Sequence, residues 1–196
     1  MSSEELSQGQ ISGIVDRLSG LFANQGGELY GGEAVTQLEH ALQAAQLAEE
    51  QGSPAHEIVS ALLHDVGHLI HDLGEDCAER GIDDTHERSG ADWLEAEAGF
   101  HDAVTQPVRL HVPAKRFLCA VDAEYHANLS DASQLSLSLQ GGPFTDDQVA
   151  AFRKTPYSES AVRLRTWDDK AKHPGLPTPP LQHFLGLIDP SMFAST

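Results

Sequence analysis

Histidine and aspartate occur together in an otherwise apolar segment, residues 60–72, with the sequence SALLHDVGHLIHD. His64 and Asp65 are adjacent in it, and His68 follows His64 by one helical turn. Moving an imidazole and a carboxylate out of water is costly unless a partner compensates for the lost hydration, and a metal ion is one such partner. The segment therefore predicts a metal site.

Further candidate ligands lie on or at the ends of other expected helices. They are His40, His86, His111 and Asp168. With His64 and Asp65 they supply nitrogen and oxygen donors that suit iron, manganese, cobalt or zinc. Adjacent helical side chains point about 100° apart, so either both converge on one ion or Asp65 bridges two. A single histidine is more often a hydrogen-bonded core residue, and we expect the remaining histidines, including His71, to be structural or exposed.

Two cationic residues are spaced to join this set. Lys115 follows His111 by four residues and Arg165 precedes Asp168 by three, which places each pair on one helical face. A guanidinium can bind an oxyanion with two hydrogen bonds, and an ammonium supplies a point charge. The pattern predicts an anionic substrate beside the metal site, with surface salt bridges as the alternative.

Composition limits the possible partners and compartments. The 196 residues fit a single domain, 1–196, and the formal net charge of −18 would repel a nucleic acid. Cys77 and Cys119 are far apart and suggest neither a zinc ribbon nor a dithiol redox site. The first ten residues do not resemble a signal peptide, and no apolar stretch approaches the length of a membrane span. We expect a soluble, cytoplasmic protein that binds no membrane.

Apolar residues at helical spacing, with capping residues before them, predict an all-α domain. The expected helices cover residues 33–51, 54–72, 85–99, 112–129, 144–154 and 157–172, with one more that is kinked or ends near Pro107 or Pro113. Loops are expected near residues 24–33, 73–84, 127–143 and 173–180. In the third of these, Gly141 and Gly142 either expose backbone N–H groups to an anion or form a simple turn.

The motifs LYGGEAVTQLEHALQAA, ALLHDVGHL, HVPAKRFLCA, SLSLQGG and RLRTWDDKAK resemble the HD-domain superfamily of helical metalloproteins. They are most similar to its oxygenases that cleave carbon–phosphorus bonds in 1-hydroxyphosphonates. The resemblance covers about residues 28–172 and implies an HD-domain helical bundle. It also implies a mixed-valent Fe(II)/Fe(III) pair of iron ions as cofactor, with O₂ as co-substrate.

The resemblance implies a role for each matching residue. One iron is held by His40, His64, Asp65 and Asp168, and Asp65 bridges to a second iron held by His86 and His111. Tyr30 occupies an iron position before substrate arrives, Glu33 helps to exchange it for substrate, and His68 lies close to the substrate. The phosphonate is surrounded by Lys115, Ser136, Gln140 and Arg165.

The implied reaction is oxidative cleavage that releases phosphate and a carboxylic acid. The likeness favours 1-hydroxy-2-(trimethylammonio)ethylphosphonate, giving glycine betaine, over 2-amino-1-hydroxyethylphosphonate, giving glycine. Tyr30, Tyr125, Glu33 and Glu39 are candidates to meet the quaternary ammonium. We expect a separate hydroxylase to make the substrate. An HD-type metal-dependent phosphohydrolase and a catalytically idle metal-binding module are the alternatives.

Overall fold

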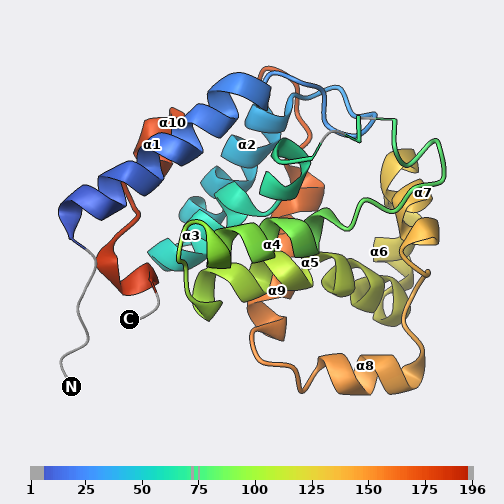
Figure 1. The fold of residues 1–196 in the computed structure, drawn as a ribbon. Coiled ribbons are helices and arrows are strands. Elements are labelled where there is room, and N and C mark those ends of the chain that lie inside the picture. Colours follow the sequence, from blue (N-terminus) through green and yellow to red (C-terminus); the bar gives the residue numbers. More distant parts are fainter. Residues whose placement is uncertain (1–6, 72, 75, 194–196) are drawn as a thin grey trace.

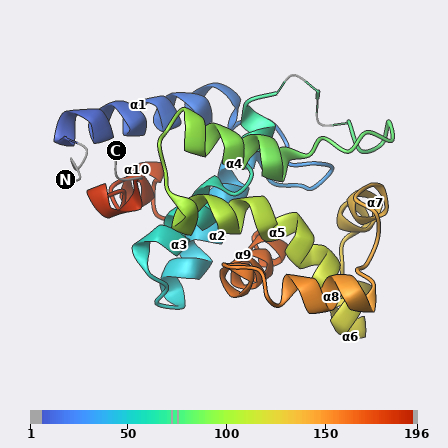
Figure 2. The ribbon, with the colours of Figure 1, turned by 60° about the horizontal axis from the view of Figure 1, so that its bottom comes forward.

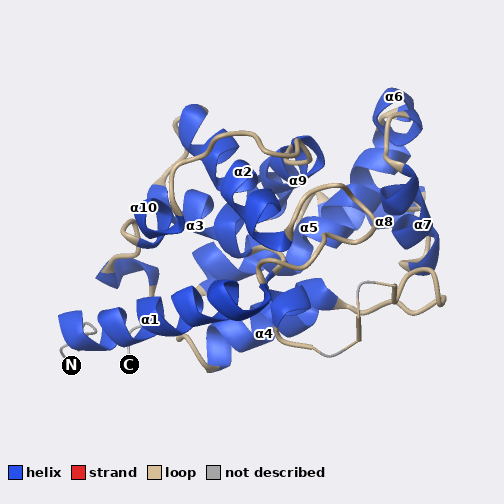
Figure 3. Ribbon diagram, turned by 90° about the horizontal axis from the view of Figure 1, so that it is seen from above, coloured by secondary structure: helices blue, strands red, loops and turns tan. Residues whose placement is uncertain are grey.

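The computed structural model describes residues 7–71, 73–74 and 76–193, and these ranges contain helices and no β-strand (Figures 1 and 3). The elements are α1 (Gln8–Gln25), α2 (Gln37–Glu50), α3 (Ala55–Leu63), the 3₁₀ helix η1 (Val66–Leu69), α4 (His86–Ala96), α5 (Asp102–Val121), α6 (Ala123–Ala127), α7 (Asp131–Leu139), α8 (Asp146–Phe152), α9 (Ser158–Lys170), α10 (Leu181–Leu185) and the 3₁₀ helix η2 (Pro190–Met192). The expected all-α fold is confirmed. Among the described helices, none combines the length and the apolar character that crossing a membrane requires.

Five helices form the centre of the bundle. Helix α5 packs against α3, α4 and α9, and it lies between α4 and α9 in Figure 2. Helix α2 packs against α3 and α9. Helices α1 and α10 lie on one side of this centre, and α6, α7 and α8 gather on the opposite side (Figure 1). The chain thus brings helices that are distant in sequence together around α5.

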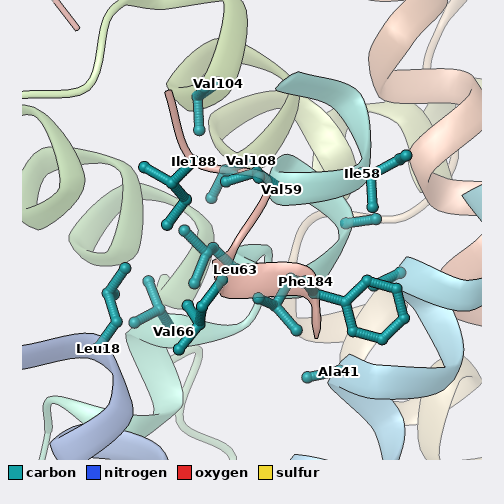
Figure 4. Close-up of a cluster of buried hydrophobic side chains, with 14 of the residues drawn as sticks. Leu18, Ala41, Ile58, Val59, Leu63, Val66, Val104, Val108, Phe184 and Ile188 are labelled. Carbon is teal, nitrogen blue, oxygen red and sulfur yellow. The ribbon is translucent and has the colours of Figure 1, made fainter. Parts of the chain in front are cut away.

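The main apolar core joins the N-terminal and C-terminal helices to the central ones. Figure 4 shows Leu18, Val59, Leu63, Val104 and Phe184 converging from α1, α3, α5 and α10. Each of them is at most 1% exposed. Burying such a side chain stabilises the fold by about 1.5–3 kcal/mol. The core therefore fixes the end of α3, where the HD pair begins.

The HD pair lies at a helix end rather than inside a helix, contrary to the expected helix over 54–72. Helix α3 ends at Leu63, His64 is its C-cap, and Asp65 leaves helical geometry with φ −104° and ψ 17°. The chain then turns into η1. This turn removes the divergence that two adjacent helical side chains would have. Asp72, at the end of the expected helix, lies outside the described residues.

Two other boundary predictions were wrong. Helix α5 continues through Pro107 and Pro113, so the alternative that it ends near these prolines is wrong; packing against α3, α4 and α9 supports the continuous helix. Helix α7 occupies most of the loop expected at 127–143. Its serine-rich sequence has a weak apolar pattern, but Ser130 caps it and it buries Ser133 and Leu137.

Two glycines allow η1 to lie directly against α4. A Cβ on Gly67 would be 2.1 Å from the carbonyl oxygen of His86, and one on Gly90 would be 2.9 Å from the backbone nitrogen of Gly67. Because the neighbouring atoms are backbone, neither contact can be relieved by rotating a side chain. The close approach places the rings of His68 and His86 in a stack, with their centroids 4.0 Å apart.

We expect Gly67→Ala to lower the free energy of unfolding by about 1–3 kcal/mol, because η1 and α4 must separate to accept the methyl group. Gly13→Ala is the matched control, since Gly13 lies in α1 with open space around its Cβ position. That control should raise the free energy of unfolding by about 0.5–1 kcal/mol. Chemical denaturation measures both, and equal stability of Gly67→Ala and wild type would contradict the packing constraint.

Candidate metal centre and substrate cavity

The first pair of candidate ligands joins α2 to the end of α3. The Nε2 atoms of His40 and His64 are 3.1 Å apart. Their Nδ1 atoms each lie 2.8 Å from a backbone carbonyl, that of Ala171 for His40 and that of Ala61 for His64. Because a carbonyl can only accept, each Nδ1 carries a proton, and each Nε2 is left to face inward. Asp168 on α9 completes this group, with Oδ1 3.4 Å from His40 Nε2.

The second pair joins α4 to α5 in the same way. The Nε2 atoms of His86 and His111 are also 3.1 Å apart. His111 Nδ1 lies 2.7 Å from the Val108 carbonyl, and His86 Nδ1 lies 2.8 Å from Oδ1 of Asp84. Both Nδ1 atoms therefore have fixed acceptors, and both Nε2 atoms point into the interior.

Asp65 lies between the two histidine pairs. Its Oδ2 is 3.2 Å from His64 Nε2 and 3.5 Å from His40 Nε2. Its Oδ1 is 3.4 Å from His86 Nε2 and 3.5 Å from His111 Nε2. The side chain is 6% exposed, and within the described part of the chain neither oxygen accepts a hydrogen bond. One carboxylate thus presents one oxygen to each pair.

The donor set fits a cation at each pair. Two imidazole nitrogens with inward lone pairs repel each other at 3.1 Å unless a positive charge lies between them. Nitrogen ligands about 2.1 Å from an ion and at right angles to each other are about 3.0 Å apart, which is close to the observed separation. Asp168 also contributes, since Oδ1 has no hydrogen-bond donor among the described residues. Its Oδ2 forms an ion pair with Arg165, 2.7 Å away.

Protons can take the place of the metal in this arrangement. Burial lowers the pKa of His40, but contacts with Asp168 and Asp65 outweigh it and raise the pKa to about 9. Burial likewise opposes the charge on His86, but Asp84 raises the pKa of His86 to about 9. Below pH 9 a metal ion must therefore displace a proton at each pair.

We expect metal affinity to rise with pH between 6 and 8. His40 and His86, whose pKa values lie near 9, are protonated across this range, so each bound ion should release about one proton. The affinity of each pair should then increase about tenfold per pH unit. Zinc titration calorimetry in buffers of different ionisation enthalpy measures both quantities, and a pH-independent affinity without proton release would oppose this account.

Asp65→Ala is expected to weaken metal binding at both pairs, because each pair loses an oxygen ligand and the shared negative charge. His111→Ala is the matched control, since it removes one ligand from one pair. After anaerobic loading with ferrous iron, metal analysis should show loss of both ions in Asp65→Ala and of one ion in His111→Ala. Retention of a full complement in Asp65→Ala would exclude the bridging arrangement.

A cavity of about 100 Å³ opens beside the His86–His111 pair and is lined by all four predicted substrate residues, Lys115, Ser136, Gln140 and Arg165. Lys115 on α5 donates to Ser136 Oγ on α7 at 2.9 Å and is 3% exposed. Burial, followed by the charge of Arg165, lowers the pKa of Lys115 to about 7. Gln140 also lines the cavity, and its buried Oε1 has no hydrogen-bond partner among the residues described. These side chains give the cavity an ammonium group, a hydroxyl group and an amide whose oxygen has no hydrogen-bond partner among the described residues.

Arg165 lines the cavity but is largely engaged by other residues. Its Nε donates to Asp169 Oδ2 at 3.0 Å and approaches the Tyr125 hydroxyl at 3.2 Å, and its Nη2 contacts Asp169. Nη1 pairs with Asp168. The forked face that the sequence assigned to an oxyanion is therefore held by Asp169. Arg165 supports the candidate ligand Asp168 as well as bordering the cavity.

The glycine pair after α7 forms a turn rather than an anion site. Gly141 and Gly142 have φ values of 97° and 70°, which end the helix. The Gly142 N–H donates to the Leu137 carbonyl at 2.9 Å, and Arg116 donates to the carbonyls of both glycines. The simple-turn alternative is the one that the structure supports.

Tyr30 and Glu33 lie on the cavity wall near the first histidine pair. The Tyr30 ring stacks on His40 with centroids 3.9 Å apart and an interplanar angle of 12°. Glu33 Oε1 accepts from Ser130 Oγ at 2.6 Å and from Lys172 Nζ at 2.8 Å. Lys172 was not selected from the sequence as a functional residue, although it ends the RLRTWDDKAK motif.

The two other ammonium candidates have structural contacts instead. Glu39 accepts from the backbone and hydroxyl of Thr36 in the capping box of α2. Tyr125 donates to Asp169 at 2.5 Å.

A third imidazole group surrounds Asp84 at the cavity wall. His68 Nδ1 and His71 Nε2 lie 3.0 Å and 3.4 Å from Asp84 Oδ2. His71 was expected to be structural or exposed, and its contact with this carboxylate is compatible with a structural role. Asp84 lies two residues before His86, was not selected from the sequence as a site residue, and directly precedes Thr85, the N-cap of α4. The D-x-H spacing of Asp84 and His86 was the sequence signal that could have indicated a contact between this carboxylate and the His86 ring.

Two relatives of this chain are named as phosphonate dioxygenases. No family model matches the sequence. The chain is 41% identical over 188 residues to [1-hydroxy-2-(trimethylamino)ethyl]phosphonate dioxygenase (glycine-betaine-forming) of Leisingera caerulea, covering 96% of this chain and 95% of that protein. It is 46% identical over 172 residues to hydroxymethylphosphonate dioxygenase of Gimesia maris, covering 86% and 85%. It is 35% identical over 189 residues to uncharacterized protein L432 of Acanthamoeba polyphaga mimivirus, covering 95% and 85%. The chain belongs to the family of the phosphonate dioxygenases.

Proposed function

We propose that the chain cleaves the carbon–phosphorus bond of a 1-hydroxyphosphonate with O₂. The proposed substrate is 1-hydroxy-2-(trimethylammonio)ethylphosphonate, and the products are glycine betaine and phosphate. The proposal is supported above all by the cavity that Lys115, Ser136 and Gln140 line together with His86 and His111. We also place the reaction in the cytoplasm and expect a separate hydroxylase to supply the 1-hydroxyl group.

The proposed cofactor is a pair of iron ions, Fe(II)/Fe(III), one at each histidine pair, with Asp65 between them. Bound there, the pair supplies the redox chemistry that a reaction with O₂ requires. The donor chemistry supports this choice, since imidazole and carboxylate suit iron. Asp168 and Asp65 also place negative charge where cations are needed.

The protein's own residues bind and orient the substrate. Lys115 and Ser136 meet the phosphonate oxygens, and the amide N–H of Gln140, which also lines the cavity, can donate a further hydrogen bond to them. Lys115 is buried, so its charge is poorly screened and acts strongly on a dianion. Arg165 holds Asp168 and adds positive potential. Tyr30 and Glu33 line the cavity, and the Tyr30 ring stacks on His40. His68 also lines the cavity and stacks on His86.

The overall reaction balances with one proton released. The hydroxyphosphonate dianion and O₂ give a carboxylate, hydrogen phosphate and H⁺. The carbon that bears the hydroxyl is oxidised, O₂ is reduced, and the carbon–phosphorus bond is replaced by bonds to oxygen. A hydrolase of the same fold would consume no O₂.

The two named relatives differ in the group that their substrate carries besides the hydroxyl and the phosphonate. The Leisingera protein is named for a trimethylamino substrate and the Gimesia protein for hydroxymethylphosphonate, which has no amine. Here the cavity is lined by Tyr30, Glu33 and Asp83, an aromatic ring and carboxylates of the kind that favour a quaternary ammonium. Hydroxymethylphosphonate is the second candidate because of the identity with the Gimesia protein.

The direct test measures O₂ uptake and products with iron-loaded protein. Three substrates are compared: the trimethylammonio compound, 2-amino-1-hydroxyethylphosphonate and hydroxymethylphosphonate. We expect equal amounts of O₂ consumed, phosphate released and glycine betaine formed, with the highest kcat/KM for the trimethylammonio compound. Phosphate release without O₂ would refute the oxygenase function, and a higher kcat/KM for hydroxymethylphosphonate would refute the substrate assignment.

Lys115→Met should separate substrate binding from metal binding. Loss of the ammonium should raise KM about 10- to 100-fold, the effect of losing a charged hydrogen bond of about 1.5–3 kcal/mol, while metal content stays unchanged. The variant should also gain stability on the order of 1–3 kcal/mol at pH 7, because a buried charge is removed.

The pH dependence of stability provides the matching control. The pKa of Lys115 is about 7 in the fold and about 10.4 in an unfolded chain, so the unfolded state binds more protons between these values. Wild type should therefore gain stability from pH 7 to pH 10, relative to Lys115→Met. An unchanged KM in Lys115→Met would remove this residue from the substrate site.

A further inference from the structure

One carboxylate, Asp84, contacts three imidazoles on the cavity wall. Its Oδ1 accepts from His86 Nδ1 at 2.8 Å, and its Oδ2 lies 3.0 Å from His68 Nδ1 and 3.4 Å from His71 Nε2. The side chain of Asp84 is only 7% exposed. The carboxylate therefore connects a candidate metal ligand to a cavity residue and to a more exposed histidine.

The backbone around Asp84 is shaped to make these contacts. Thr85 has φ 51° and ψ 33°, a left-handed conformation that a β-branched residue rarely adopts. Its side chain makes no capping hydrogen bond, but the His86 backbone N–H points to Asp84 Oδ1 at 3.3 Å. Asp84 thus caps α4 in place of the formal N-cap residue. Strain at Thr85 is maintained because it returns Asp84 to the ring of His86.

We propose that Asp84 is a positioning residue that fixes the orientation and tautomer of His86 and His68 together. Its Oδ1 keeps the proton of His86 on Nδ1, so that Nε2 faces His111. Its Oδ2 keeps the proton of His68 on Nδ1, so that His68 Nε2 can accept a hydrogen bond. The inference rests on the proposed function only in taking His86 as a metal ligand. A carboxylate behind a ligating histidine raises the basicity of that ligand.

Asp84→Asn tests the role because an amide has one acceptor where a carboxylate has two. The amide oxygen should stay at the Oδ1 position, where the backbone N–H and Nδ1 of His86 both donate. The amide NH₂ then faces His68, which must give up its Nδ1 proton and carry it on Nε2. The geometry of the site is otherwise kept, since the two side chains have the same shape.

Nitrogen-15 NMR and zinc calorimetry measure the two consequences. Metal-free wild type should have neutral His68 protonated at Nδ1, and Asp84→Asn should move that proton to Nε2. Zinc binding at the His86–His111 pair should weaken about 10- to 100-fold in the variant, and binding at the His40–His64 pair should not change. The wild-type tautomer is informative even if the variant fails to fold.

Two matched variants separate positioning from other effects. Asp83→Asn removes the same charge one residue away, at an exposed position, and should leave the His68 tautomer and both zinc affinities as in wild type. His71→Ala removes only the outermost contact and should do the same. A protein that meets these expectations but does not oxidise phosphonates would retain this inference and lose the proposed function.

Three results would overturn the inference. The first is a wild-type His68 protonated at Nε2, and the second is an Asp84→Asn variant with unchanged tautomer and zinc affinities. The third is a third zinc ion in wild type that His71→Ala abolishes, which would make the Asp84 group a metal site of its own.

Discussion

Asp65 and the four imidazole nitrogens around it need positive charge between them, and the rest of the structure depends on this need. Each nitrogen is left with an inward lone pair because the opposite side of its ring is held by a carbonyl or a carboxylate. The carboxylate between them has no hydrogen-bond donor in the described residues. Such a group is unstable in a protein interior without positive charge. Every helix of the central bundle contributes, because α2, α3, α4 and α5 each carry or precede one member of this group, and α9 carries Asp168, whose Oδ1 lies 3.4 Å from His40 Nε2.

The pairing of charges also determines which cation of the cavity is free to bind a ligand. The chain has an excess of acidic residues, yet Lys115, Arg165 and Lys172 are brought to one cavity wall. Two of these cations already have carboxylate partners, since Arg165 pairs with Asp168 and Lys172 with Glu33. For Lys115, the contact found among the described residues is the neutral Ser136. Its charge is therefore the one left to interact with an anionic ligand.

The clustering of the candidate ligands could be predicted from the sequence because metal chemistry restricts residue types strongly. His64 and Asp65 were conspicuous in an apolar segment, and Asp168 and Lys115 followed from helical spacing and family resemblance. The helix that was expected to carry the HD pair ends before it. No local signal marks this end, and directly after it η1 packs on α4 through Gly67.

Long-range contacts explain most of what the sequence did not predict. Lys172 meets Glu33 across 139 positions, and a single-chain pattern cannot pair residues at that distance. Helix α5 keeps its prolines because tertiary packing outweighs their local cost. Asp84 has an ordinary capping signature, and its contacts with three imidazoles arise only when η1 and α4 meet.

If Asp65 holds two cations, one at each oxygen, crystals of the iron-loaded protein should show both by anomalous scattering at the iron absorption edge. We expect two peaks, one between Asp65 Oδ2 and the His40–His64 pair and one between Oδ1 and the His86–His111 pair. A single peak, or iron bound elsewhere with Asp65 uncoordinated, would mean that Asp65 does not bridge two ions.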